Sequence, residues 1–165
     1  MQNVQSRPII MNANLEIDKI DRDIISILMD DAKTPYSEIA KRIVVSGGTV
    51  HVRMKKLEHM GIIQGSTLVI NAAKLGYGLT AYLGVYLNRG GIYNQVIVEL
   101  EQIPQVVEAH YTTGVYSIFL KLICRNTKDL RDVLNDKIQT IEGVQRTETI
   151  LSLEESIKRP VQFGS

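Results

Sequence analysis

The chain has 165 residues, of which 44% are hydrophobic, and a formal net charge of +1. This length fits one domain or two compact domains of about 60–80 residues. The near-zero charge excludes a global field for nucleic acid, so any such contact must come from a local patch. A single cysteine, Cys124, excludes an intrachain disulfide and a multi-cysteine zinc site. No apolar stretch approaches a membrane span and no signal-peptide pattern is present, so we expect a cytoplasmic protein.

The N-terminal half has a helical period after a short irregular segment. Residues 1–15 show no clear periodicity, and we predict a flexible tail there. Asp18 is a candidate N-cap, and Ile20, Ile24 and Leu28 form an apolar stripe at helical spacing. A first helix is therefore predicted from Asp18 onward.

Two further helices are predicted before residue 62. Thr34 followed by Pro35 is typical of a helix start, with the proline at the first helical position. Ser46 is a candidate cap of the third helix, and Gly61 a candidate C′ glycine at its end. The expected inward-facing residues are Ile39, Ala40 and Ile43 in the second helix and Val50, Met54 and Leu57 in the third.

Two connections in this half carry specific expectations. Segment 62–70, with Gln64-Gly65 as its turn, predicts a short hairpin or wing. The turn between the second and third helices holds Val44, where glycine often supplies a positive φ. Because a β-branched residue would be strained in that conformation, we expect a different turn geometry.

The third predicted helix has a basic exposed face. Between Tyr36 and His59 there are five Lys/Arg residues and two Glu, a local charge of +3. Glycines at the helix start let a phosphate approach free backbone N–H groups. The pattern favours double-stranded DNA as partner, and the alternative is a generic three-helix bundle with a solvated basic face. The candidate DNA-binding residues are Ser46, Gly47, Gly48, Thr49, His51, Val52, Arg53, Lys55 and Lys56.

From Leu79 the period changes to two, which is typical of strands. In this first strand the odd positions are aliphatic and the even positions are Thr, Tyr or Gly. The predicted elements are strand 79–87, helix 93–101, strands 106–113 and 115–124 around a tight turn at Gly114, helix 128–140 and strand 144–153. This β-α-β-β-α-β order predicts a ferredoxin-like sandwich, so the chain as a whole is α+β.

The change of period also predicts the domain organisation. The helices of a ferredoxin-like unit cover only one sheet face, and the other face would present Tyr82, Tyr86 and Phe119. A semi-apolar face without a helix predicts a homodimer. The expected segments are a tail at 1–15, a DNA-binding domain at 16–70, a linker at 71–78, a second domain at 79–155 and a C-terminal tail at 156–165.

Several motifs together resemble the Lrp/AsnC family of bacterial and archaeal regulators. They lie at residues 20–25, 36–40, 45–58, 61–63, 111–119, 137–141 and 147–149. The resemblance covers about residues 16–155, and its C-terminal motifs are most similar to the AsnC branch, whose effector is asparagine. It implies a winged helix-turn-helix followed by a ligand-sensing αβ sandwich. It also implies dimers formed through the sheets and assembled into octameric discs.

The resemblance further implies an effector site between dimers, lined by the turn between the middle strands. The carried-over residues are Tyr111, Thr113, Gly114, Tyr116 and Ser117 in the turn, and Gln139, Thr147 and Thr149 from the same or a neighbouring chain. Many family members have Asp where this chain has Ser117, so a carboxylate that could pair with a ligand ammonium is absent here. Ligand preference therefore does not transfer directly from the leucine-responsive branch.

The residue types at this predicted site suit a small zwitterion. Gly114 permits a tight turn with exposed amides for a carboxylate, and Gln139 could pair with a side-chain amide. By themselves, Thr147 and Thr149 are better explained as ordinary strand threonines, because threonine is enriched in strands. The histidines are scattered and no catalytic, metal-binding or cofactor motif is present, so we expect neither an enzyme nor a cofactor. The open alternative is an architectural DNA-binding protein of this fold without an amino-acid response.

Overall fold

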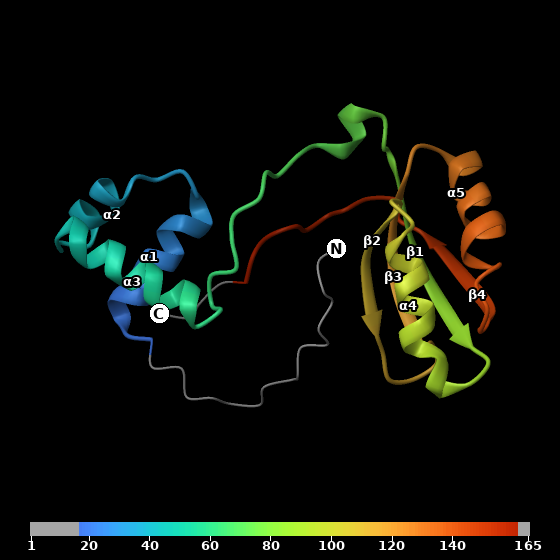
Figure 1. Cartoon of the computed structure of the whole chain (residues 1–165). Helices are drawn as coiled ribbons and strands as arrows, with labels where there is room; N and C mark the ends of the chain where they lie inside the picture. Colours follow the sequence, from blue (N-terminus) through green and yellow to red (C-terminus); the bar gives the residue numbers. More distant parts are fainter. Residues whose placement is uncertain (1–16, 162–165) are drawn as a thin grey trace. The chain divides into compact units, whose positions relative to one another are not determined.

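The computed structural model describes residues 17–161, which form two compact units (Figure 1). The first unit contains residues 17–68 together with 159–161, and the second contains residues 69–158. The tail predicted at 1–15 and the last four residues of the predicted C-terminal tail lie outside the described residues.

The first unit is a three-helix arrangement of α1 (Lys19–Asp30), α2 (Tyr36–Arg42) and α3 (Gly47–His59). Its core is built from the stripes that the helical period predicts. Ile24, Ile39 and Val50 have no exposed surface, and Ile20, Leu28 and Ile43 pack around them. The apolar side chains of three short helices thus share one core, which none of them could form alone.

Local side chains start two of the helices as predicted. Asp18 caps α1 in a reciprocal capping box with Asp21, and Ser46 caps α3 by accepting from the backbone N–H of Thr49 at 3.0 Å. The N-cap predicted for α2 is wrong, although the helix itself forms. Its N-cap is Pro35, and the hydroxyl of Thr34 donates to the carbonyl of Asp31 at 2.8 Å instead.

The turn after α2 has the geometry that a β-branched residue was expected to avoid. Val44 has φ +57°, its N–H donates to Lys41 at 3.4 Å, and the N–H of Val45 donates to Ala40 at 2.9 Å. These bonds form a Schellman motif, which requires a left-handed residue at this position. The sequence-based expectation of another geometry is therefore wrong, because backbone bonds that end the helix outweigh the local strain.

The end of α3 follows the prediction, whereas the predicted hairpin does not form. Gly61 has φ +69°, and Ile62 donates to the carbonyl of Leu57 at 3.0 Å, so α3 ends at a C′ glycine. Segment 62–70 contains no strand, and the hairpin predicted there is wrong. Its residues beyond 63 are exposed, so no packed face fixes a strand register.

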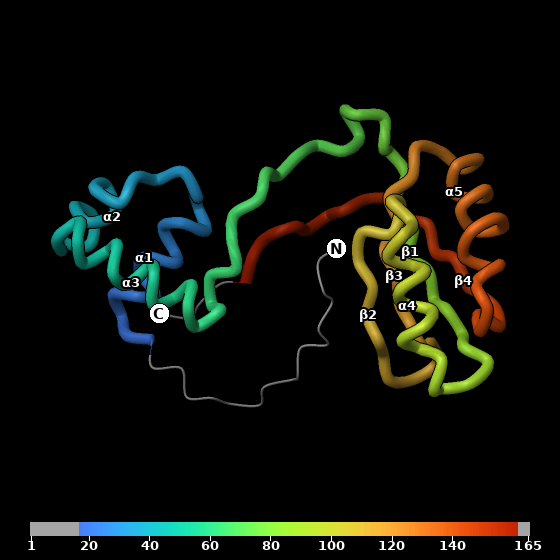
Figure 2. The backbone as a smooth tube through the Cα atoms, viewed as in Figure 1, coloured from blue at the N-terminus to red at the C-terminus, as the bar shows by residue number. Residues whose placement is uncertain are grey.

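The second unit is a four-stranded antiparallel sheet with helices on one face (Figures 1 and 2). The strand order is β2-β3-β1-β4, the ferredoxin-like order. The elements are η1 (Ala72–Leu75), β1 (Leu79–Leu87), η2 (Gly90–Ile92), α4 (Tyr93–Glu101), β2 (Val106–Tyr111), β3 (Ile118–Cys124), α5 (Thr127–Val133), η3 (Leu134–Ile138) and β4 (Val144–Leu151).

The central strand β1 divides its side chains between the two sheet faces. Ala81, Leu83 and Val85 are fully buried against the helices, in a core that also contains Leu100 and Ile138. The alternate residues of β1 lie on the face without helices, as the period of two predicts.

The main differences from the predicted elements lie around β3 and α5. The predicted tight turn at Gly114 is a longer loop over residues 112–117, in which Gly114 has φ +106°. The helix predicted over 128–140 begins at Thr127 and changes to a π-helical turn, η3. A π-turn inserts an extra residue into the helical ladder, which periodicity does not reveal.

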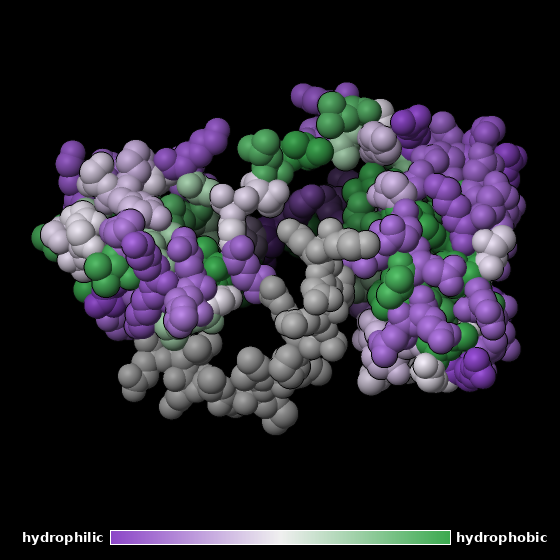
Figure 3. All heavy atoms as spheres, viewed as in Figure 1, coloured by the Kyte–Doolittle hydropathy of each residue, from purple (hydrophilic) through white to green (hydrophobic). Residues whose placement is uncertain are grey.

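The segment that leads into the second unit is apolar at its surface (Figure 3). Leu68, Val69, Ile70 and Leu75 are 77%, 88%, 60% and 64% exposed, respectively. The linker predicted over 71–78 contains η1, which is capped by Asn71 and ended by a left-handed Gly76. The segment is thus partly ordered by its own caps.

We expect Val44→Gly to stabilise the first unit. A left-handed L-residue costs roughly 1–2 kcal/mol. Glycine removes this strain, but its larger conformational entropy in the unfolded state offsets about 0.5–1 kcal/mol of the gain. Because Val44 is 89% exposed, little packing is lost. Calorimetry should show the melting temperature of this unit rising by a few degrees. Val44→Ala is the control, and an equal melting temperature for the two variants would show that strain is not the cause.

Candidate nucleic-acid interface and candidate effector site

The N-terminal turn of α3 is an open backbone surface. Ser46, Gly47 and Gly48 are exposed, and a Cβ atom on Gly47 would meet no atom within 4 Å. Ser46 uses its side chain to cap Thr49, and the other N–H groups of the first turn have no intrahelical partner. An N-terminus with this composition favours a phosphate, because the helix dipole and the free N–H groups act together.

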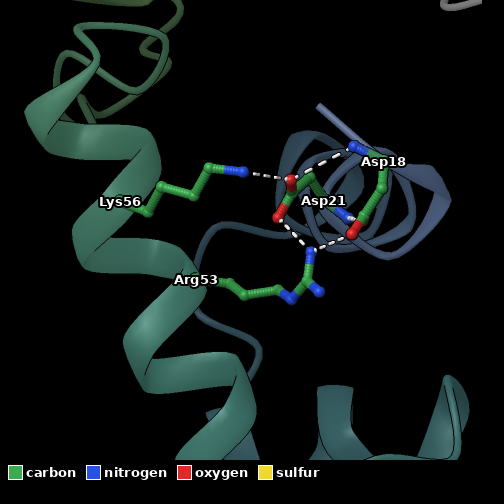
Figure 4. A network of polar contacts seen from close by, with 4 residues as sticks. All are labelled: Asp18, Asp21, Arg53 and Lys56. Atoms are coloured by element: carbon green, nitrogen blue, oxygen red, sulfur yellow. Dashed lines mark hydrogen bonds and ion pairs between the residues drawn. The ribbon is translucent and has the colours of Figure 1, made fainter. Parts of the chain in front are cut away.

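The predicted DNA-binding residues further along α3 lie in two different environments. His51, Val52 and Lys55 are exposed, and Val52 is 66% exposed. Arg53 and Lys56 are directed toward α1, where both contact Asp21 (Figure 4). The sequence pattern places all five on one polar surface but does not reveal this division.

Asp21 is the centre of an ion-pair network between α1 and α3 (Figure 4). Its carboxylate has no exposed surface and accepts from Arg53 Nη1 at 2.9 Å, Lys56 Nζ at 3.1 Å and the Asp18 backbone N–H at 3.2 Å. Arg53 Nη1 also donates to the carboxylate of Asp18. A buried carboxylate is tolerated when it is paired and hydrogen-bonded in this way.

The pKa values of these groups follow from the contacts. Burial raises the pKa of Asp21, but hydrogen bonds from Arg53 and Lys56 more than offset it, so the pKa lies below its ordinary value. The hydrogen bond from Arg53 lowers the pKa of Asp18, and hydrogen bonds to Asp18 and Asp21 raise the pKa of Arg53. All three groups are therefore charged at neutral pH.

The network changes the charge that this unit presents. The predicted +3 counts residues 36–59 alone. Over residues 17–59 there are eight Lys/Arg and seven Asp/Glu, a balance of +1. Two acids of α1 lie against two cations of α3, and Arg42 is paired with Glu38 at 3.2 Å. Lys55 is exposed and lies outside this network, whereas Lys56, although also exposed, is paired with Asp21.

In the second unit, the predicted effector loop crosses the sheet end near β1. The N–H of Ser117 donates to the carbonyl of Val85 at 2.9 Å, and the hydroxyl of Thr112 donates to Tyr116 at 2.8 Å. Thr113 and Gly114, at the tip of the loop, are exposed. The loop is therefore anchored at both ends while its tip faces solvent.

Tyr116 ties this loop to the sheet face without helices. Its hydroxyl donates to Glu148 at 2.9 Å, and Tyr86 donates to the other carboxylate oxygen at 2.9 Å. Arg146 donates to Glu148 at 2.6 Å and stacks over the ring of Tyr86 at 3.5 Å. A Cβ atom on Gly84 would lie 2.3 Å from the Tyr116 ring, so this packing requires glycine. The sequence analysis did not identify Glu148, although the period of two places it on this face.

The remaining predicted effector residues lie on the opposite face. Gln139 donates through Nε2 to Thr147 Oγ1 at 3.1 Å, directly after the π-helical turn, and Thr149 lies two positions further along the same strand. Tyr111 packs on Tyr93 of α4 with ring centroids 4.3 Å apart. Within the chain, the eight residues therefore form separate groups rather than one pocket.

The described part of the chain adds two negative observations. Residues 17–161 contain no group of three or more His, Cys, Asp or Glu side chains that could hold a metal ion. Within that same range, no helix has the length and apolarity to cross a membrane. Burial raises the pKa of the Cys124 thiol to about 11, so it stays protonated.

Comparisons with known proteins match both units. Residues 17–64 match the family described as winged helix-turn-helix DNA-binding, and residues 80–162 match the Lrp/AsnC ligand binding domain. A DNA-binding unit joined to a ligand-binding unit defines a transcriptional regulator rather than an enzyme. The chain belongs to the Lrp/AsnC family of such regulators.

Individual relatives agree with this assignment. The chain is 44% identical to "Regulatory protein AsnC" of Haemophilus influenzae, over 88% of this chain and 97% of that protein. It is similar to the structure of Escherichia coli AsnC, with 42% identity, a TM-score of 0.84 and coverage of 88% and 97%. A Mycobacterium tuberculosis feast or famine regulatory protein complexed with L-methionine shares 28% identity, a TM-score of 0.79 and coverage of 86% and 95%.

The lowered pKa of Asp21 predicts an acid-dependent stability. The unfolded state binds this proton more readily than the folded state, so the contribution is present at neutral pH and is lost as pH falls below about 4. Asp21→Asn should reduce the free energy of unfolding at pH 7 by about 2 kcal/mol, through lost charge-assisted hydrogen bonds. Urea denaturation should show this difference narrowing between about pH 5 and pH 3. Asp23→Asn, at a partly exposed position of α1 where the carboxylate lies 3.6 Å from Lys19 Nζ, is the control. A difference independent of pH would contradict the assignment.

Proposed function

We propose that this regulator binds specific double-stranded DNA sequences through α3 and responds to a small amino acid, with asparagine favoured. The observation that carries the DNA part is the capped, glycine-started N-terminus of α3, whose first-turn backbone is open to a phosphate. The amino-acid part is supported by the AsnC relatives and by the methionine complex of the mycobacterial relative.

The proposed DNA contacts divide into positioning and reading groups. Ser46, Gly47 and Gly48 would hold a phosphate, and phosphate contacts fix the register of a protein on DNA. Thr49, His51 and Val52 would face base edges, and Lys55 a phosphate. The charges of Arg53 and Lys56, the other two predicted contacts, already lie against Asp21, so Lys55 rather than these two would contact a phosphate.

We expect Lys55→Gln to flatten the salt dependence of DNA binding. Each lost phosphate contact lowers the slope of log K against log salt by about 0.9. The probe is a duplex selected from a random library with the wild-type protein, titrated by fluorescence anisotropy at several salt concentrations. Lys128→Gln, on α5 of the second unit, is the matched control. An unchanged slope for a folded Lys55→Gln protein would remove α3 as the DNA-facing helix.

The open sheet face supports a proposed homodimer. Tyr82 stacks on Phe119 with ring centroids 5.9 Å apart, and Tyr116 stacks on Phe119 at 6.0 Å. Ile150 on the same face is 52% exposed. An aromatic, helix-free face of this kind favours contact between copies of the chain. Dimers joined further into octameric discs would bring the separate groups of predicted effector residues from different chains together.

The proposed effector site combines the loop tip with groups from β4. Gly114 allows a backbone conformation in which amides can face a ligand carboxylate, and Ser117 supplies a hydroxyl. Gln139 and Thr147, already hydrogen-bonded to each other, can exchange that bond for one with a side-chain amide. Tyr111, Thr113, Tyr116 and Thr149 complete the proposed lining.

We expect asparagine to bind at this site and to change DNA affinity by linkage. Calorimetry with asparagine, glutamine, aspartate and leucine tests the binding, and the coupling to DNA is typically about 1–3 kcal/mol. Gly114→Val should abolish binding, because φ +106° is closed to a β-branched residue. Gln139→Leu should weaken asparagine more than leucine, because it leaves the ligand amide unpaired.

The matched control is Gly65→Val, which places the same change at a positive-φ glycine of the first unit. Failure of all four amino acids to bind at millimolar concentration would remove the effector proposal. The DNA-binding proposal would stand, and an architectural role would then be the better description.

A further inference from the structure

The cations of α3 differ in what they already contact. Arg53 has a side chain that is only 25% exposed and is directed at two carboxylates of α1 (Figure 4). Lys56 directs its ammonium at the same buried carboxylate. Lys55, between them in sequence, is exposed, because consecutive residues point about 100° apart around a helix.

Asp21 is held in place independently of the two cations. It occupies the third position of α1 and takes part in both hydrogen bonds of the capping box, with Asp18 at 3.0 and 3.2 Å. Its position near the helix N-terminus also favours the charged form. A carboxylate fixed in this way provides a preorganised partner for Arg53 and Lys56.

A phosphate would have to compete with this partner. For Arg53 to reach DNA, the guanidinium would leave a carboxylate with no exposed surface, and a buried charge without its partner is strongly unfavourable. Asp18 and Asp21 together balance the charges of Arg53 and Lys56. Arg53 and Lys56 therefore add little sequence-independent attraction to DNA.

We infer that Asp21 limits the attraction of the DNA-binding unit for DNA: it holds Arg53 and Lys56, so that α3 meets DNA through its N-terminal turn and Lys55 and not through these two cations. Phosphate attraction supplies most non-specific binding, whereas base contacts supply sequence discrimination. Withholding these two cations thus lowers affinity for random and selected DNA by a similar factor, because a phosphate contact acts uniformly across sequences. The inference rests on the proposed contact of α3 with DNA.

The test compares Asp21→Asn with the wild-type full chain on a random-sequence duplex and on the selected duplex. Because Asp18 still holds Arg53 in this variant, Asp21→Asn releases Lys56 and should steepen the salt slope on random DNA by up to about 0.9 per chain. At 0.1 M salt this corresponds to about eightfold tighter binding per released cation. The ratio of selected to random affinity should stay nearly constant, because phosphate contacts act uniformly across sequences. A purely structural role of Asp21 would instead weaken binding to both duplexes without steepening either slope.

Arg53→Gln keeps the inference falsifiable if Asp21→Asn does not fold. In the wild-type background it should leave the salt slope unchanged, whereas the neighbouring Lys55→Gln flattens it by about 0.9. In a folded Asp21→Asn background, Lys56→Gln should flatten the slope by about 0.9, whereas Lys56→Gln in the wild-type background should not, and this double-mutant cycle isolates the released charge. A flatter slope for Arg53→Gln in the wild-type background would overturn the inference.

The two proposals fail in different ways. If Lys55→Gln leaves the slope unchanged, the proposed contact of α3 with DNA is wrong. If Lys55→Gln flattens the slope but a folded Asp21→Asn does not steepen it, the neutralising role of Asp21 is wrong and the DNA contact stands.

Discussion

The DNA-binding unit depends on one buried carboxylate. A charge without exposed surface must be paired, and the partners of Asp21 come from a helix more than thirty positions away in the chain. This requirement fixes α3 against α1 at the polar edge of a small apolar core formed by Ile24, Ile39 and Val50. The same contact sets how much positive charge the unit presents, so packing and electrostatics cannot be changed independently here.

In the ligand-binding unit, strand β1 is the element on which both the core and the open sheet face depend. Its odd residues fill the core beneath the helices, and its even residues support an aromatic and polar face. Gly84 leaves space for the ring of Tyr116, which brings the loop over residues 112–117 to Glu148. The side chain of Tyr116 therefore connects this loop to the sheet face at which we propose that two chains meet.

Much of the fold could be predicted because local rules and burial agree. The stripe of Ile20, Ile24 and Leu28 and the alternation of β1 both follow from the periods of regular structure. The failures have local physical causes. The hydroxyl of Thr34 donates to the carbonyl of Asp31 instead of capping α2. The segment after α3 has no packed face that would hold a hairpin. Val44 adopts a strained φ because backbone hydrogen bonds end α2 at this turn.

By itself, the sequence determined the two units, their element order, the N-terminal turn of α3 and the glycine of the loop predicted to bind the effector, because each depends on residues close together in the chain. The tertiary structure alone decided that Arg53 and Lys56 contact Asp21, that Tyr116 and Tyr86 share Glu148, and that the predicted effector residues lie on both sides of the sheet. These facts depend on side chains far apart in sequence. Which of these side chains meet depends on how helices cross and strands pair in three dimensions. The local periodicity of the sequence does not predict these contacts.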